Sequence, residues 1–387
     1  MESWHRKLRM GMVGGGQGAF IGGVHRMVAA MGQQVELVAG CFGRDPENTR
    51  LTGKQLYLDP GRCYDTYQQM VEAEAKLPPD KRIDFVTIVT PNVAHFEIAK
   101  AFLEAGFHVV CDKPMTYSLP QAEELVKVVE RTKLVFAITY NYTGYPLVRH
   151  ARHLFRQGEM GQVRKVLVEY LQDFLMSPLE KLGQKQAAWR TDPAIAGVGG
   201  TLGDIGTHCF HLVEYVTGDP VVELCADKSV ALPDRKLDDD ANILLRFKGG
   251  GKGILTISQV AAGEDNALSL RVYASNGAVL WEQERPDHLK VYRYGQPRQV
   301  LSRGHGEYLS EAATKATHLP SGHTEGYLEA FEVVYAGAIE ALRRHIDGKP
   351  MDPKDYDCPN VHDGLRGVKF IAKAVESADK GSVWVSI

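Results

Sequence analysis

The chain has 387 residues, which is enough for two domains, because a single hydrophobic core rarely grows to that size. Hydrophobic residues make up 44% of the chain, charged residues make up 24%, and the formal net charge is -3. This balance gives no strong electrostatic field toward nucleic acid or an acidic membrane surface.

Cysteine usage and the N-terminus indicate the cellular compartment. The six cysteines show neither CxxC pairing nor zinc-ligand spacing, and several lie in apolar, strand-like runs. The basic N-terminus continues into a glycine-broken strand and helix instead of a long apolar segment, so we expect no signal peptide and no transmembrane helix. The sequence predicts a reduced, cytoplasmic protein with no membrane or nucleic-acid partner.

The first predicted element is a buried strand that breaks into a helix across glycine, between Leu8 and Ala19. Gly14, Gly16 and Ala19 fill the small positions of G-x-G-x-x-G/A, which permits a tight turn, close approach of a pyrophosphate, and helix packing. The positive end of the following helix would face the phosphates. A glycine-rich turn can be only a turn, but the elements downstream favour a dinucleotide site. Its expected contacts are Gly14, Gly15, Gly16, Gln17, Gly18, Ala19 and Phe20.

Strands and helices alternate up to about residue 144. Predicted strands cover 35–41, 84–89, 108–111 and 134–139; a helix starts at Asp45-Pro46-Glu47, and further helices cover 95–105 and 119–132. Strict alternation predicts a doubly wound parallel sheet. We therefore expect an α/β dinucleotide-binding domain over residues 1–144.

The pattern changes in the second half, from residue 145 to 387. A helix (145–156) and a strand (163–170) lead to alternating strands from Val221 onward, and Asn276-Gly277 is a strong hairpin signal. Further helices are predicted over 204–216, 325–344 and 363–376. These elements predict an α+β substrate domain with a mainly antiparallel open sheet, and an open sheet face favours a homodimer or homotetramer.

Ligands of parallel sheets bind beyond the carboxyl ends of the strands, so the segments that follow the strands are candidates for a site. These segments are Thr90-Pro91-Asn92 with His95, Asp112-Lys113-Pro114, and Tyr140-Asn141-Tyr142. Solvated loops with helix caps are the alternative, and for Asn92 and His95 that alternative stays open. Lys113 is the stronger candidate, because a buried strand and a proline hold it in place.

The segment from Gly197 to His211 carries further candidate chemistry. If Asp204 begins a helix, Asp204 and His208 share one face, so the carboxylate can orient the imidazole as a general base. An N-cap aspartate and a core histidine are the alternative. A zinc site at His208 and His211 lacks a recognisable third ligand, so we expect no metal. Trp189 and Arg190 could line the site or only pack.

Taken together, these motifs resemble the Gfo/Idh/MocA family of NAD(P)-dependent oxidoreductases over essentially the full chain. The resemblance implies a Rossmann domain that binds NAD or NADP, and a second domain that binds a sugar, glycoside or inositol. Lys113 matches the lysine of the family's EKP motif, and Asp204 and His208 match its catalytic pair. The expected cofactor contacts beyond the glycine turn are Arg44, Thr90, Pro91, Asn92, His95, Asp112, Lys113, Asn141, Trp189 and Arg190. The expected substrate contacts are Lys113, Tyr140, Asn141, Tyr142, Arg190, Asp204, His208 and His323.

Two departures from the family pattern affect the cofactor site. Asp112 replaces the usual glutamate, which shortens its reach. The second strand is followed by Arg44 instead of an acidic residue that would hold a ribose hydroxyl, so NADP should be tolerated and could be preferred. The expected reaction is hydride transfer between nicotinamide and a secondary alcohol of a cyclic polyol. The alternatives are a glycoside hydrolase that retains NAD and oxidises its substrate transiently, and a non-catalytic nucleotide-binding regulator.

Overall fold

The computed structural model describes residues 6–387 and divides into two compact units. The first unit contains the chain up to Tyr140 together with Phe331–Leu365, and the second contains Asn141–Ala330 with Arg366–Ile387. The expected absence of a signal peptide rests partly on residues 1–5, which lie outside the described residues. No described helix is both long enough and apolar enough to cross a membrane.

Helix α11 (Tyr327–Ile346) is where the chain passes from the second unit back to the first. The predicted domains, 1–144 and 145–387, place this whole helix in the second domain. The first boundary of the compact units falls close to residue 144, whereas the return at Phe331 was not anticipated. The sequence of a continuous amphipathic helix gives no local signal at the residue where the helix passes from one hydrophobic core to the next.

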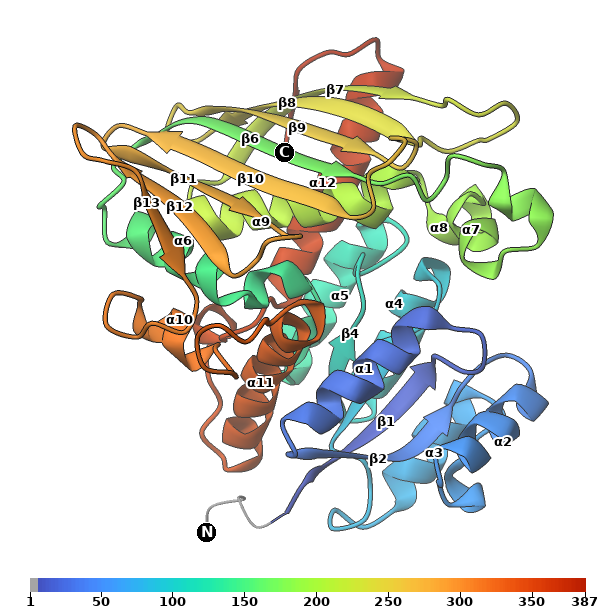
Figure 1. Ribbon diagram of the computed structural model, residues 1–387. Coiled ribbons are helices and arrows are strands. Elements are labelled where there is room, and N and C mark those ends of the chain that lie inside the picture. The colour runs from blue at the N-terminus through green and yellow to red at the C-terminus, as the bar shows by residue number, and fades with distance from the viewer. Residues whose placement is uncertain (1–5) are drawn as a thin grey trace. The chain divides into compact units, whose positions relative to one another are not determined.

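The first unit is built on a five-stranded parallel sheet of order β2-β1-β3-β4-β5 (Figure 1). Its strands are β1 (Leu8–Gly14), β2 (Val35–Cys41), β3 (Phe85–Val89), β4 (His108–Cys111) and β5 (Phe136–Ile138). The connecting helices are α1 (Phe20–Met31), α2 (Pro46–Gln55), α3 (Tyr67–Lys76), α4 (His95–Glu104) and α5 (Leu119–Thr132). The predicted doubly wound α/β fold is confirmed, and α3 is an additional helix that the pattern did not indicate.

The strand register aligns the carboxyl ends of four strands. Gly14 of β1 lies opposite Val89 of β3, and Cys111 of β4 lies between Ile88 of β3 and Ile138 of β5. Because parallel strands end at a common edge, the segments that follow them meet there. The glycine turn and the segments that begin at residues 90, 112 and 139 are thus neighbours within this unit.

Two glycines bring helix α1 against the turn that precedes it. A Cβ added at Gly22 would lie 2.3 Å from the Cα of Gly15 and 2.8 Å from its carbonyl oxygen. Gly14 and Gly15 also have positive φ angles of 88° and 73°, a region that suits glycine. The close approach of helix and turn is therefore made by Gly15 and Gly22, while Ala19 is the N-cap residue of α1.

The second unit contains a nine-stranded sheet of order β13-β12-β11-β10-β6-β9-β8-β7-β14. Its strands are β6 (Val163–Leu171), β7 (Val221–Ser229), β8 (Asp240–Phe247), β9 (Lys252–Ser258), β10 (Ala267–Ala274), β11 (Gly277–Glu282), β12 (His288–Arg293), β13 (Gln299–Ser302) and β14 (Val385–Ser386). The pair β6–β9 is parallel and the other pairs are antiparallel, so the predicted mainly antiparallel sheet is confirmed. The hairpin signal at residues 276–277 falls between the antiparallel strands β10 and β11.

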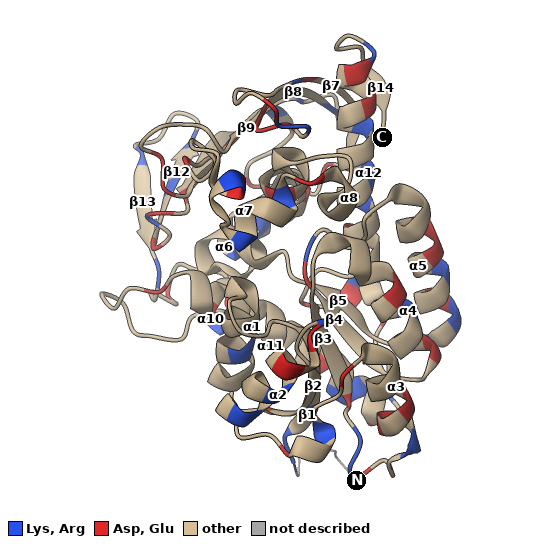
Figure 2. Cartoon of the chain, turned by 90° about the vertical axis from the view of Figure 1, so that its right-hand side faces the viewer, with Lys and Arg blue, Asp and Glu red and all other residues tan. Residues whose placement is uncertain are grey.

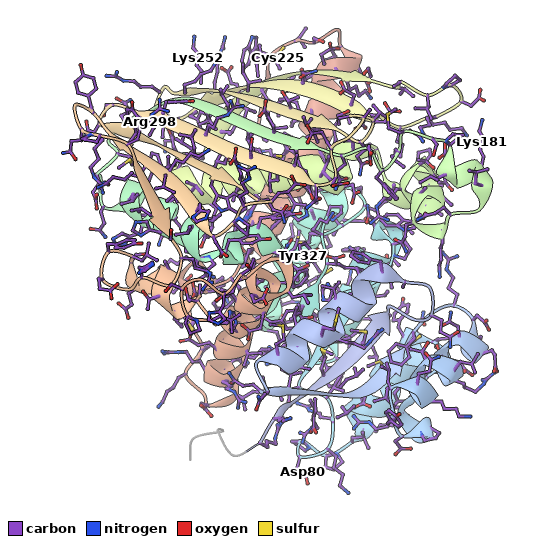
Figure 3. The ribbon with its side chains drawn as sticks, in the orientation of Figure 1. Asp80, Lys181, Cys225, Lys252, Arg298 and Tyr327 are labelled. Atoms are coloured by element: carbon purple, nitrogen blue, oxygen red, sulfur yellow. The ribbon has the colours of Figure 1, made fainter. Side chains whose placement is uncertain are left out.

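Helices cover one face of this sheet. Figure 1 shows α6 (Pro146–Arg156) and α9 (Thr207–Thr217) along that face, and the side chains of both helices join the hydrophobic core of the unit. Helix α12 (Val361–Asp379) contributes Phe370 to the same core. The side chains of Lys252 and Cys225, labelled in Figure 3, lie on the other face of the sheet and point away from these helices.

The helix predicted over 204–216 starts earlier than expected. Its first turn is a π-helical segment (Leu202–Gly206) that continues directly into α9. Asp238, which precedes β8, accepts hydrogen bonds from the amides of Gly200 (2.8 Å), Leu202 (2.7 Å) and Thr201 (2.9 Å). The start of this helix is therefore capped by a residue distant in sequence, and Asp204 is not its N-cap.

Charged residues of both signs are distributed over the surface. Figure 2 shows acidic and basic positions interspersed along α4 and α5. The short helices α7 (Lys185–Arg190), α8 (Pro193–Ala196) and α10 (Glu311–Lys315) lie in the long connections of the second unit. They were not predicted, because segments this short lack a helical period.

Gly22 and the adjacent Gly23 offer a matched test of the close helix–turn contact. Gly22→Ala should lower the free energy of unfolding by about 1–3 kcal/mol, because its methyl group would meet backbone atoms of Gly15. Gly23→Ala should be neutral or stabilising by up to about 1 kcal/mol, because the nearest atom to its Cβ is 4.0 Å away. Urea unfolding of both variants measures the difference, and equal stabilities would contradict the contact.

Candidate active site

The N-terminus of α1 lies at the carboxyl edge of the first sheet and is suited to an anion. Its N-cap, Ala19, provides no side-chain cap, and the first turn carries no acidic residue. The amides of Gly16 and Gln17 are bound by Phe42 O (3.0 Å) and Asn48 Oδ1 (3.1 Å). These bonds fix the turn, and the positive end of the α1 dipole is left for a phosphate.

The segment after β2 carries an exposed arginine, Arg44, instead of an acidic residue that would hold a ribose hydroxyl. The next residue, Asp45, is the N-cap of α2, and its Oδ1 accepts a hydrogen bond of 3.0 Å from the amide of Glu47. The carboxylate of Asp45, the first acidic residue after β2, is thus engaged in capping α2.

His95 ties together two of the loops at this edge. Its side chain is buried, with Nε2 2.8 Å from the carbonyl oxygen of Thr90 and Nδ1 2.9 Å from that of Pro114. Burial lowers the pKa of His95, although both carbonyl contacts act in the opposite direction. A neutral imidazole carries one N–H, so it donates to one of the two carbonyls. His95 therefore holds the loop after β3 to the loop after β4, and its predicted cofactor contact stays a prediction.

Asp112 begins the segment that carries Lys113. Its Oδ1 accepts a 2.8 Å hydrogen bond from Thr139 Oγ1 and lies 3.8 Å from Nε2 of His25. Burial raises the pKa of the Asp112 carboxyl, but His25, Lys113 and Thr139 together bring it below its usual range. Asp112 is therefore a carboxylate at neutral pH. Lys113 itself is partly buried.

In the second unit, Asp204 lies in the π-helical turn and is paired with two side chains. Its Oδ2 accepts hydrogen bonds from Arg190 Nε (3.1 Å) and from Gln259 Nε2 (3.0 Å). The guanidinium of Arg190 also lies over the ring of Trp189, 4.3 Å from its centroid. The structure thus brings together the predicted residues Arg190, Trp189 and Asp204.

Amide and hydroxyl side chains extend this cluster across the ends of three strands. Gln259 donates to Gln172 Oε1 (3.1 Å), and both Gln172 (2.7 Å) and Tyr170 (2.7 Å) donate to Asn266 Oδ1. We call the set Asp204, Gln259, Gln172, Asn266 and Tyr170 the polar chain. Its three amide residues were missed from the sequence, although each lies directly beside an end of β6, β9 or β10.

His208 adjoins the aromatic end of the polar chain. Its ring is T-shaped against Tyr142, with centroids 4.8 Å apart, and 6.5 Å from that of Tyr170. The hydroxyl groups of these two tyrosines are hydrogen bonded. Burial raises the pKa of Tyr142 to about 12 and raises that of Tyr170 well above its usual value, so both phenols are neutral. Tyr327, labelled in Figure 3, also packs against Tyr142, with centroids 6.3 Å apart.

The remaining predicted residues have different surroundings. Tyr140 and Asn141 are buried at the junction between the units in the chain. His323 is exposed in a long connection, and its backbone carbonyl accepts a hydrogen bond from Arg303. Within residues 6–387, no group of three histidine, cysteine, aspartate or glutamate side chains is placed to hold a metal ion.

Two family models match the chain. Residues 8–140 match the oxidoreductase family with an NAD-binding Rossmann fold, and residues 148–280 match the Gfo/Idh/MocA C-terminal domain. The matched segments correspond to the parallel sheet of the first unit and to most of the large sheet of the second.

Individual relatives span most or all of the chain. An uncharacterized oxidoreductase, YfiI, from Bacillus subtilis is 34% identical over 98% of this chain and 97% of its own length. Levoglucosan dehydrogenase from Pseudarthrobacter phenanthrenivorans is 29% identical over 80% of this chain and 81% of its own length. Crystal structures of an inositol dehydrogenase homolog from Azotobacter vinelandii, one complexed with NAD+ and one with NADH and myo-inositol, are 37% and 36% identical, with TM-scores of 0.95 and 0.92, and cover 100% of this chain and 99% of theirs. The chain therefore belongs to the Gfo/Idh/MocA family of oxidoreductases.

Proposed function

We propose that this protein is an NAD(P)-dependent dehydrogenase that oxidises a secondary alcohol of a neutral cyclic polyol, such as an inositol, a hexose or a glycoside. The observation that carries this proposal is the polar chain beside His208. It presents amide and hydroxyl groups, which donate and accept hydrogen bonds, and a ring with many hydroxyls needs both kinds of partner. Each buried hydroxyl left unpaired would cost roughly 1–3 kcal/mol.

The charges around the polar chain favour a neutral substrate over a phosphorylated one. Its guanidinium neighbour, Arg190, is already paired with Asp204 at 3.1 Å, and both side chains are largely buried. A phosphate here would compete with the Asp204 carboxylate for that cation. The names of two relatives, levoglucosan dehydrogenase and the myo-inositol-bound homolog, agree with a neutral cyclic polyol.

The glycine turn and the uncapped start of α1 fit a dinucleotide, because a pyrophosphate needs close backbone approach and a positive helix end. When bound, the nicotinamide ring accepts the hydride. His95 and the hydrogen bonds of the amides of Gly16 and Gln17 keep the surrounding loops in place. Arg44 is available for a 2'-phosphate.

We assign three residues to the reaction. His208 takes the proton from the reacting hydroxyl as general base, and Asp204 keeps negative charge near that histidine. Lys113 donates a hydrogen bond that stabilises the alkoxide as it develops. Asp204 is held by Arg190 and Gln259, so its carboxylate has a fixed orientation.

An absorbance assay for nicotinamide reduction, run with inositols, hexoses, glycosides and their phosphates, tests the proposal. We expect NADH or NADPH to form with a neutral polyol, and the unphosphorylated member of each pair to be preferred. Product analysis distinguishes the alternatives: cleavage of a glycoside without net NADH indicates a hydrolase, and binding without turnover indicates a regulator. A clear preference for a sugar phosphate would contradict the neutral-polyol assignment.

Replacing either of two residues should remove most of the turnover. His208→Asn and Lys113→Ala are each expected to lower kcat by on the order of a hundredfold or more, which is typical of a lost acid–base or charge-stabilising group. Cofactor Kd, measured by fluorescence, should change little. His211→Asn, at a second buried histidine on α9, controls for the loss of an imidazole. Near-full turnover in either variant would remove that residue from the mechanism.

The cofactor preference should depend on Arg44. Asp45 caps α2, so its Oδ1 is engaged there and not in holding a ribose hydroxyl, and the exposed Arg44 can pair with a 2'-phosphate. We expect Arg44→Ala to lower the ratio of NADP to NAD efficiency (kcat/KM) by about tenfold, equivalent to one charge-assisted hydrogen bond. Arg50→Ala, which removes an exposed arginine already paired with Glu47, is the control. An unchanged ratio would show that Arg44 does not contact the cofactor.

Two expectations about the whole molecule stay predictions. The homodimer or homotetramer expected from the open sheet is measured by size-exclusion chromatography with light scattering. The cytoplasmic location is measured by cell fractionation.

A further inference from the structure

A buried histidine on α1 contacts α11 directly and reaches β3 through a tyrosine hydroxyl. His25 has no exposed surface, and its Nδ1 lies 2.7 Å from the hydroxyl of Tyr335 on α11. That hydroxyl is also 3.2 Å from Thr87 Oγ1 on β3. The ring packs edge-on against Phe331, with centroids 4.9 Å apart. These contacts set the plane of the imidazole.

The other ring nitrogen of His25 faces the segment that carries Lys113. Its Nε2 is buried, has no hydrogen-bond partner among the described residues and lies 3.8 Å from Asp112 Oδ1, a contact that becomes an ion pair when the imidazole is protonated. The same oxygen accepts the hydrogen bond of Thr139 Oγ1. A largely buried carboxylate is costly unless it is paired and hydrogen bonded, so these two partners determine where the side chain of Asp112 can lie.

The backbone around Asp112 is held as well. Its amide donates to Ile88 O (3.0 Å), and the amide of Thr139 donates to Cys111 O (3.1 Å). Asp112 is thus anchored through its backbone to β3 and through its side chain to Thr139 and His25. Lys113 extends from the very next residue, so the anchoring of Asp112 sets the starting point and direction of the lysine.

We propose that His25 is a positioning residue for Lys113: it holds Asp112 and so fixes the position of the lysine relative to the glycine turn that precedes α1. The inference rests on the role of Lys113 in the proposed function. His25 has no exposed surface, so it would act through Asp112 and not by touching the substrate. It lies on the helix whose N-terminus faces the cofactor site, so one rigid element connects that site to the lysine.

Two substitutions separate the two sides of the imidazole. His25→Asn keeps an amide near the Nδ1 position and loses the group that faces Asp112, whereas His25→Gln places an amide near the Nε2 position. We expect kcat of His25→Asn to fall about ten- to a hundredfold, because a displacement of about 1 Å has this scale of effect, with KM and cofactor Kd within about threefold. His25→Gln should recover most of kcat. Equal kcat in the two variants would overturn the proposal.

Asp112→Asn tests whether His25 acts through Asp112. If it does, the loss in Asp112→Asn should resemble that in His25→Asn, and the double variant should be no worse than either single one. Multiplying losses would show that the two residues act independently, which contradicts the proposal. Circular dichroism and urea unfolding check that each variant is folded; if His25→Asn does not fold, the comparison of Asp112→Asn with His25→Gln carries the test.

A readout without substrate separates this inference from the proposed function. Acetic anhydride labelling of Lys113, followed by peptide mass spectrometry, reports the surroundings of its amine. We expect the labelling rate to change in His25→Asn and in Asp112→Asn but not in His25→Gln. If wild type oxidises no polyol while this pattern holds, the proposed function fails and the positioning of Lys113 stands. An unchanged rate in all variants overturns the positioning itself.

Discussion

The parallel register of β1, β3, β4 and β5 is the constraint on which the first unit depends. It sets Gly14 opposite Val89 and Cys111 opposite Ile138, so four chain segments leave the sheet at one edge. A slip of one residue would turn every side chain of a strand to the other face and separate these segments. The links made by His95, between two loops, and by Asp112 with Thr139 exist only in this register.

Much of this unit could be predicted from the sequence because its signals are local. Glycine at fixed spacing and alternation of apolar strands with helices indicated the fold, and the rule of carboxyl ends selected Thr90, Asp112 and Lys113 as candidates. The partners of those residues could not be predicted. His25 and Tyr335 are far apart in the sequence, and neither carries a motif that connects it to Asp112.

The second unit shows the same division between local signals and distant contacts. The helical spacing of Asp204 and His208 singled out both residues, and their helix exists. The partners of Asp204 come from elsewhere: Arg190 from α7 and Gln259 from the end of β9. A single glutamine or asparagine at the end of a strand has no spacing signal, so the polar chain became visible only once the strands were paired.

Asp238 gives the turn around Asp204 a property that no local interaction could supply. Three successive amides, those of Gly200, Thr201 and Leu202, are bound by this one residue in the connection between β7 and β8. If that connection opened, all three would lose their acceptor at once, each at a cost of roughly 1–3 kcal/mol. We therefore expect the connection and the first turn of the helix to open and close together, which couples the backbone before Asp204 to the closure of the β7–β8 hairpin.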